Sequence, residues 1–530
     1  MRTRFDVIVV GGGHNGLVCA CYLAAAGVSV CVLERHAEVG GAAVTEEFYP
    51  GFRNSVASYT VSLLQRRIIE ELALRSHGLR IVPRPLANFV PSRDGAGLAL
   101  PSDAAAASAA IAEHSRRDAE RYAAFCAERA AVAGLVRPLL LEAPVDPSLG
   151  PREWLRAAVR LARFSRAPSG TAAALWQLLT GSAGHWLDGW FESDLLKGGL
   201  GFDSIVGHFA SPYDPGSGYL LLHHALGDAL GEPGVWGHAI GGMGAISRAL
   251  ERAARARGVE IRTGCTVERI EPVRAGFEIE TAGSTYAARA VAGAVHPQLL
   301  FGRLIAREHL PEPFAERIDR WRSESATLRI NVALSELPDF TCRPGRTAAE
   351  HHGAGILIAP SLGYLERAHT DARSDGWSRA PVIELLVPST IDDTLAPPNA
   401  HVASLFCQHF RRRLPEGGWD EHKDAAVRLA IETVNEYAPN FAAAVLAVQA
   451  LTPEDLERRF GLVGGDIFHG ALTLDQLYWA RPALGYSQYR TPLRGLYLSA
   501  SGAHPGGGVT GAPGYNAARA MLADRARWPR

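Results

Sequence analysis

Lysine is nearly absent from this chain, which has 530 residues and balanced charge. Of its 54 basic residues only two are lysines, Lys197 and Lys423, and they stand against 55 acidic residues. The chain therefore lacks the basic surplus that is typical of nucleic-acid-binding proteins, and we expect no nucleic-acid partner. Schiff-base chemistry, or a catalytic water held by a lysine, would have only these two side chains to use.

Cysteine is also scarce, and long apolar runs are missing. The chain has 7 cysteines and no CxxC pair, which excludes a zinc ribbon and a dithiol redox centre, and we predict no metal site. It has no run of 18 apolar residues, so we expect no membrane-spanning helix. Residues 1–4 run straight into a strand-like segment, and we expect no signal peptide. Together with the low cysteine content, this favours a cytoplasmic protein.

The N-terminus has the pattern of a nucleotide-binding unit. A β-branched run, a glycine loop, a helical stretch, a second β-branched run and an acid follow one another at 5–10, 11–16, 17–26, 28–33 and Glu34. This order is that of the first βαβ unit of a Rossmann-like fold, in which an acid lies about 20 residues beyond the loop. The sequence therefore predicts an α/β domain that binds a dinucleotide.

The glycines of the GxGxxG motif have separate roles. Gly11 permits the tight turn, Gly13 lets the backbone approach a diphosphate, and Gly16 allows close packing of the helix on the strand. The start of the helix offers free N–H groups to phosphate oxygens. Glu34 is expected to accept hydrogen bonds from the adenosine ribose.

The loop after Glu34 indicates which dinucleotide is bound. A second glycine pair, Gly40-Gly41, follows in a place where an NAD dehydrogenase requires none. The stretch VIVVGGGHNGLVCACYLAAAGVSVCVLERHAEVGGAAVTEE resembles the FAD module of the phytoene desaturase and amine oxidase superfamily. The resemblance implies noncovalent FAD. The contacts that it implies in this module, beyond those of the first motif, come from His14, Asn15, Arg35, Gly40, Gly41 and Ala42.

A middle segment fits a return of the chain to the same sheet. The GGMG sequence at 241–244 opens a helical stretch at 245–257, which precedes two short strands within 259–272 and another at 286–297. Members of the superfamily use such a segment to complete the FAD sheet. The resemblance places the backbone of Val267 near the adenine.

A glycine-rich stretch near the C-terminus offers a second GxGxxG match, at Gly506, Gly508 and Gly511. Only 19 residues follow Gly511, with neither a second strand nor an acid at the required spacing, so we exclude a second nucleotide domain. We expect instead a final strand at 495–499, this loop and one last helix. The resemblance implies that the loop lies along the flavin. The contacts that it implies there come from Gly502, Gly508 and Val509.

The resemblance runs from about residue 5 to about residue 523 and is most specific for one family of the superfamily. The stretches WFESDLLKGGLGFDSIVG, LTPEDLERRFGLVGGDIFHGALTLDQLYWARP and SGAHPGGGVTGAPG resemble the family of pyridine nucleotide-disulfide oxidoreductase domain-containing protein 2 and its bacterial relatives. The implied fold is α/β, with a discontinuous Rossmann-like FAD-binding domain at 1–95, 236–300 and 484–530. An α+β substrate domain takes 96–235 and 301–483.

The expected substrate domain combines a mixed sheet with a helical cap. Segments at 326–333, 382–387 and 402–409 have the composition of strands. Residues 102–232 are rich in alanine and leucine and have a helical pattern. The sheet is expected to form one wall of the substrate pocket.

The resemblance implies a chemistry carried largely by the flavin. A substrate C–H bond placed against flavin N5 leaves as hydride, while the protein orients the substrate and excludes water. We expect dehydrogenation of an apolar small molecule, with oxygen or a quinone as electron acceptor. Two alternatives stay open: isomerisation, saturation or carotenoid-type ketolation of a polyene, and a flavin-bound regulatory protein without turnover. Amine oxidation is disfavoured, because the lysine that commonly holds a water there has no counterpart except Lys423, in a charged helical stretch.

No motif identifies the catalytic group. His504, in the C-terminal glycine loop, is the first candidate for a proton acceptor, and a turn residue before a proline is an equal alternative. His469 and the pair His223-His224 are further candidates, for which a structural role is favoured. Asp475 and Tyr478 are candidates for the pocket lining.

One helix invites a membrane interpretation. In WLRAAVRLARFSR at 154–166, Arg156, Arg160 and Arg163 share one face, and apolar residues form the other. We favour a helix of the cap with its arginines in water. The alternative is a basic amphipathic helix that rests on an anionic bilayer and makes the protein peripheral to a membrane.

Overall fold

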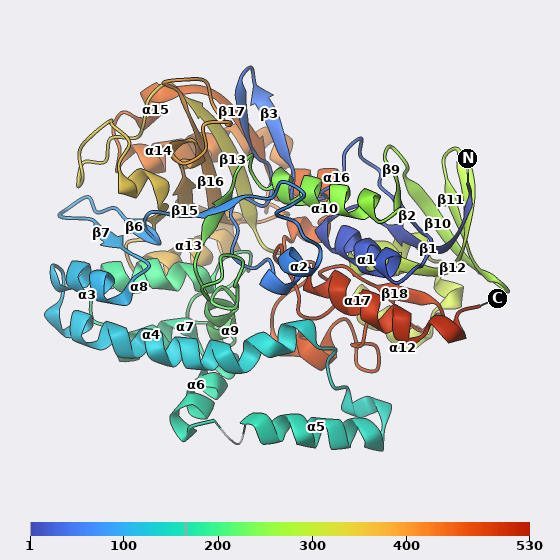
Figure 1. Ribbon diagram of the computed structural model, residues 1–530. Helices are drawn as coiled ribbons and strands as arrows, with labels where there is room; N and C mark the ends of the chain where they lie inside the picture. The colour runs from blue at the N-terminus through green and yellow to red at the C-terminus, as the bar shows by residue number, and fades with distance from the viewer. Residues whose placement is uncertain (1, 165–166, 530) are drawn as a thin grey trace.

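A computed structural model describes residues 2–164 and 167–529 of the chain. Its two seven-stranded sheets lie side by side, with a group of helices below the second sheet (Figure 1). Both ends of the chain lie on the side of the first sheet. The predicted fold class, an α/β protein with a Rossmann-like part and a second α+β part, is confirmed.

The first sheet joins strands from three distant parts of the chain. It consists of β1 (Arg4–Val10), β2 (Val30–Leu33), β9 (Glu260–Arg262), β10 (Val267–Val273), β11 (Gly276–Thr281), β12 (Ser284–Gly293) and β18 (Leu496–Leu498). β1 lies at its centre, parallel to β2 on one side and to β12 on the other, and β18 pairs with β12. The side chains of Val7 to Val10 are buried, as a parallel strand covered on both faces requires.

Helix α1 (His14–Ala25) packs against both α10 (Gly244–Ala256) and α17 (Ala512–Ala523). The predicted helix at 17–26 begins earlier, because Gly13 is its N-cap residue and the glycine loop leads straight into the first turn. Most of α1 is buried, which explains why its sequence is apolar all round rather than amphipathic.

The second sheet is antiparallel except at β6 and β14. It consists of β6 (Asn88–Val90), β7 (Leu98–Leu100), β13 (Thr327–Leu334), β14 (Gly355–Ile358), β15 (Trp377–Leu386), β16 (His401–Phe410) and β17 (Val445–Leu451). The strands predicted from 326 to 409 are confirmed as β13, β15 and β16. Helices α13 (Leu362–Asp375) and α14 (Trp419–Asn435) both contact β15.

The cap predicted within 102–232 is helical. Its helices are α3 (Ala104–Ala112), α4 (Arg116–Val136), α5 (Pro151–Phe164), α6 (Ser169–Thr180), α7 (Ala183–Trp190), α8 (Asp194–Gly201) and α9 (Ser217–His223). Phe125, Trp186 and Phe191 form an aromatic cluster that joins α4 to α7. In the described parts of the chain, the model contains no helix with the length and apolar character needed to cross a membrane.

Short elements connect these layers. They are β3 (Thr45–Tyr49), β4 (Phe52–Ser55), α2 (Arg66–Glu71), β5 (Ile81–Pro83), β8 (Gly237–Ala239), α11 (Pro297–Leu299), α12 (Glu312–Asp319), α15 (Phe441–Ala444) and α16 (Pro453–Phe460). β5 pairs with β8, whereas β6, which lies within the expected first FAD segment at 1–95, pairs with β14 of the second sheet. The division into domains stays a prediction, and we propose that its first segment ends between β5 and β6.

One buried arginine holds the long loop between α16 and β18. The Arg481 guanidinium donates hydrogen bonds to the carbonyl oxygens of Phe468 (2.9 Å), Gln476 (3.1 Å) and Ser501 (2.8 Å). Burial lowers the pKa of Arg481 to about 10, so the group is charged at neutral pH. It therefore fixes the loop against the segment that follows β18.

Replacement of this arginine tests that role. Arg481→Met should lower the free energy of unfolding by about 3 kcal/mol, because several buried carbonyl groups lose a charged donor. Urea denaturation followed by circular dichroism measures the change, and Arg413→Met, at an exposed arginine, is the control. Equal unfolding free energies for the two variants would contradict the assignment.

Candidate functional site

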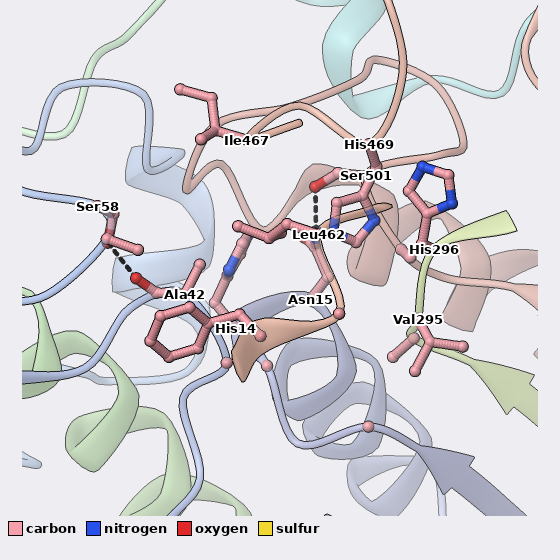
Figure 2. A pocket seen from close by; sticks show the side chains of 18 of the residues that line it. His14, Asn15, Ala42, Ser58, Val295, His296, Leu462, Ile467, His469 and Ser501 are labelled. Carbon is pink, nitrogen blue, oxygen red and sulfur yellow. Dashed lines mark hydrogen bonds between the residues drawn. The ribbon is translucent and has the colours of Figure 1, made fainter. Parts of the chain in front are cut away.

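A cavity of about 600 Å³ lies at the carboxyl end of β1 and reaches Phe406 of the second sheet. Both ends of the chain line it: Gly13 and Asn15 come from the first glycine loop, and Gly508 and Val509 from the C-terminal loop. Figure 2 shows Asn15 and Ser501 meeting at its wall. The position is the one at which open α/β sheets bind their ligands.

Gly13 and Gly16 are required for different reasons. A Cβ atom on Gly16 would lie 2.2 Å from the carbonyl oxygen of Gly11, so only glycine lets α1 start beside β1. A Cβ atom on Gly13 would have no described atom within 4 Å, and the φ of −68° at Gly13 suits any residue. Because Gly13 lines the cavity, its missing side chain leaves space for a ligand rather than for the fold.

Glu34 is buried at the end of β2, and its carboxylate already organises the loops around it. One oxygen accepts a hydrogen bond from the backbone N–H of Gly12 (2.7 Å) and the other from that of His36 (2.9 Å). Each oxygen keeps a second lone pair, and Glu34 lines the cavity. The acid is thus held in place by the protein with acceptor capacity left for a ligand.

The C-terminal loop meets the first glycine loop through direct contacts. The Asn15 side-chain amide donates to the Ser501 hydroxyl at 3.1 Å, although the two residues are 486 positions apart. The backbone N–H of Gln65 donates to the carbonyl oxygen of Thr510 at 3.1 Å. These contacts bring Gly508 and Val509 to the same cavity as Gly13.

Several polar atoms at the cavity wall are buried and have no hydrogen-bond partner among the described residues. They are His14 Nε2, Asn15 Oδ1, Ser62 Oγ and His469 Nδ1. A buried polar atom without a partner costs about 1–3 kcal/mol, so a group of them at one cavity indicates a polar ligand. Burial lowers the pKa of His14 to about 4, and burial together with the Arg481 charge lowers that of His469 to about 3. Both rings are therefore neutral at pH 7.

Most residues predicted from the N-terminal module and its resemblance are brought together. The predicted residues that line the cavity are Gly11, Gly13, His14, Asn15, Glu34, Arg35, Gly41, Ala42, Val267, Gly508 and Val509. Gly16, Gly40 and Gly502 lie outside the described lining. A Cβ atom on Gly40 would meet Val44 at 2.7 Å and one on Gly502 would meet Pro297 at 2.1 Å, so these two glycines serve close packing.

His504 lies outside the described lining of the cavity. Its Nε2 atom is 2.9 Å from the Leu139 carbonyl oxygen, and its ring packs edge-on against Tyr478. Asp475, which forms an exposed ion pair with Arg322, and Tyr478 also lie away from the lining. We therefore propose no catalytic role for His504.

Two of the other predicted histidines do line the cavity. His224 and His469 belong to the lining, whereas His223 is buried beside Phe468. His469 has a φ of +58°, which is rare for a residue with a side chain, and Figure 2 shows its ring beside that of His296. Strain of this kind is common at functional sites, which makes His469 the better supported pocket histidine.

The wall opposite the glycine loops was not predicted. It contains Tyr59, Val206, Trp236, Phe406 and Ile467, all of which line the cavity. The Tyr59 ring stacks on that of Phe406, and its hydroxyl donates to a carboxylate oxygen of Glu384 at 2.5 Å. No sequence signal could have found these residues, because they come from separate segments that meet only in the folded chain.

Comparison with known proteins places this geometry in a family. Residues 9–68 match the NAD(P)-binding Rossmann-like domain. Pyridine nucleotide-disulfide oxidoreductase domain-containing protein 2 of Rattus norvegicus is 41% identical over 99% of this chain and 94% of its own length. One of the polypeptides of limonene dehydrogenase from Castellaniella defragrans is 25% identical, over 98% of this chain and 94% of its own.

More distant proteins share the whole fold. Phytoene desaturase (lycopene-forming) of Pantoea ananas is 25% identical over 97% of this chain and 98% of its own length. The solved structure of cyclohexylamine oxidase from Brevibacterium oxydans has a TM-score of 0.57 and 17% identity, and covers 99% of each chain. The extent and identity of the match to the rat protein decide the assignment. The chain belongs to the family of pyridine nucleotide-disulfide oxidoreductase domain-containing protein 2, within the phytoene desaturase and amine oxidase superfamily of FAD-dependent oxidoreductases.

Proposed function

We propose that the protein is an oxidoreductase that binds FAD noncovalently and dehydrogenates an apolar small molecule. The observation that carries the proposal is the cavity at which the first glycine loop and the C-terminal glycine loop meet. One end offers the open position at Gly13 and the carboxylate of Glu34. Towards the second sheet the cavity has an aromatic wall at Tyr59 and Phe406.

The residues of the cavity fit a dinucleotide of this length. We propose that the loop at Gly13 holds the diphosphate, Glu34 the ribose and the backbone of Val267 the adenine. Gly508 and Val509 would lie beside the flavin. The unpartnered atoms at the glycine loop, His14 Nε2 and Asn15 Oδ1, support this because they need polar groups from a ligand. We assign Arg35, Gly41 and Ala42 to the same site.

When bound, FAD supplies a hydride acceptor. The protein's own part is to orient the substrate and exclude water. The apolar wall formed by Val206, Trp236, Phe406 and Ile467 supports an apolar substrate. Two relatives are named for the dehydrogenation of limonene and the desaturation of phytoene, which are both hydrocarbons.

Disulfide reduction, which the family name suggests, is disfavoured by the cysteines. All seven are free thiols, and Cys19 and Cys21 are buried in α1. Burial raises the pKa of Cys21 to about 12 and that of Cys19 further still, so neither forms the thiolate that the exchange reaction requires. For the electron acceptor we propose oxygen or a quinone, and for the location the cytoplasm.

The purified protein should be yellow and should release FAD into the supernatant on acid precipitation, because no covalent link is proposed. Chromatography of the supernatant identifies the nucleotide, and recovery of NAD alone would contradict the proposal. Anaerobic addition of terpene hydrocarbons, limonene first, then separates the alternatives. A dehydrogenase loses its oxidised flavin absorption, whereas an isomerase forms product with the spectrum unchanged. A regulatory flavoprotein shows neither change.

Gly13→Val should give a folded protein without FAD, because the new side chain fills cavity space and meets no described atom of the protein. Gly16→Val is the matched variant, and it should lower the yield of folded protein because its Cβ atom would clash with the Gly11 carbonyl oxygen. Flavin absorbance and circular dichroism separate the two effects. Full FAD content in Gly13→Val would remove the proposed phosphate site.

Glu34→Ala should weaken FAD binding by about 1.5–3 kcal/mol, the value of a hydrogen bond to a charged group. Titration of the FAD-depleted protein, followed by flavin fluorescence, measures the dissociation constant. Asp118→Ala is the control, since this buried carboxylate also accepts two backbone hydrogen bonds, from Glu192 (2.9 Å) and Ser193 (2.8 Å), in the helical cap. If Glu34→Ala binds FAD no more weakly than Asp118→Ala, Glu34 is not the ribose ligand.

A further inference from the structure

Helix α5 carries its apolar side away from the protein. In Figure 1 it lies at the edge of the molecule, apart from both sheets. Trp154, Leu155 and Val159 are 64%, 69% and 61% exposed, whereas the intervening face contains the buried Glu153. Residues at positions i, i+1 and i+5 lie on adjacent parts of one helix surface, so these three side chains form a continuous apolar face.

The polar side of α5 is bonded to the protein, which fixes this orientation. The side-chain amide of Gln488 donates to Glu153 at 3.1 Å, and the Arg160 guanidinium donates to the Tyr478 hydroxyl at 2.7 Å. The expectation that the arginine face lies in water is therefore wrong for Arg160. The side chain of Arg163 and residues 165–166 of the predicted helix lie outside the described residues.

Neighbouring segments extend the exposed apolar surface. The backbone N–H of Gly485 donates to Asp146 at 2.7 Å, which brings the loop after Arg481 beside the segment that precedes α5. Exposed apolar side chains of both segments flank the helix. We define the α5 patch as Leu149, Trp154, Leu155, Val159, Trp479 and Leu484.

Basic side chains border this apolar face. Arg152 and Arg156 are both exposed, and Arg156 bonds Glu153 at 2.5 Å. Glu153 is the only acid of α5 and is bonded on the inner side, so no described carboxylate of the helix lies on its outward face. Tryptophan and arginine together are typical of helices that lie in the interface of an anionic membrane.

We propose that the α5 patch docks on the surface of a lipid bilayer that contains anionic phospholipid. Trp154, Leu155 and Val159 would enter the acyl boundary, while Arg152 and Arg156 would meet the phosphate groups. A second copy of the chain is the less suitable occupant, because a twofold interface would bring two arginine-bordered faces together without an outward acid to pair them. This inference goes beyond the proposed oxidoreductase activity and does not depend on it.

Sedimentation with sucrose-loaded vesicles tests the proposal on the full-length protein. The vesicles are phosphatidylcholine with about 30% phosphatidylglycerol, compared with phosphatidylcholine alone. The wild type should sediment with the anionic vesicles, and Trp154→Ser/Leu155→Ser/Val159→Ser should lower the partition coefficient at least tenfold. The matched control is Tyr49→Ser/Val273→Ser/Leu446→Ser, which removes exposed apolar side chains from other surfaces and should bind like the wild type.

A second variant keeps the test decisive if the triple variant does not fold, which its thermal denaturation midpoint reports. Arg152→Glu changes one exposed side chain and should lower binding to the anionic vesicles several-fold while leaving binding to phosphatidylcholine unchanged. Equal sedimentation of the wild type and both α5 variants overturns the proposal, as does a wild type that binds neither vesicle. A wild-type dimer that becomes monomeric in the triple variant, without vesicle binding, would assign the patch to a second copy instead.

Discussion

The architecture depends on the close approach of the first and last helices of the Rossmann-like part. A Cβ atom on Gly514 of α17 would lie 2.0 Å from the carbonyl oxygen of Asn15 in α1, so only glycine permits this distance. Tyr22 and Tyr515 pack edge to face across the same interface, with ring centroids 4.9 Å apart. This contact sets the C-terminal loop against the first glycine loop, and the cavity lies where the two loops meet.

Buried polar groups are treated differently inside and outside that cavity. The guanidinium of Arg481 and the carboxylate of Asp118 are surrounded by protein hydrogen-bond partners. At the cavity wall, His14 Nε2 and Asn15 Oδ1 have none among the described residues. Proteins rarely leave buried polar groups unpaired, so the contrast assigns the cavity to a ligand and the rest of the interior to the fold. The open position at Gly13 indicates the same.

Local patterns predicted the parts of this structure that are contiguous in the chain. Residues 5–34 form one βαβ unit, and its glycines and acid could be assigned from their spacing alone. The wall at Tyr59 and Phe406 could not, because it depends on long-range packing of the second sheet. The same limit explains His504, whose ring turns to the Leu139 carbonyl oxygen instead of the cavity. For α5, periodicity predicted which residues share a face, but the bond from Gln488 to Glu153 decides which face meets the protein.

The most direct test of the central claim, that both ends of the chain hold one FAD, is hydrogen–deuterium exchange of the FAD-depleted protein before and after addition of FAD. The account predicts that FAD slows amide exchange in residues 11–16 and in residues 502–511 together, at the same FAD concentration. Slower exchange at the first segment with no change at the second would show that the C-terminal loop does not share the ligand, and would contradict the account.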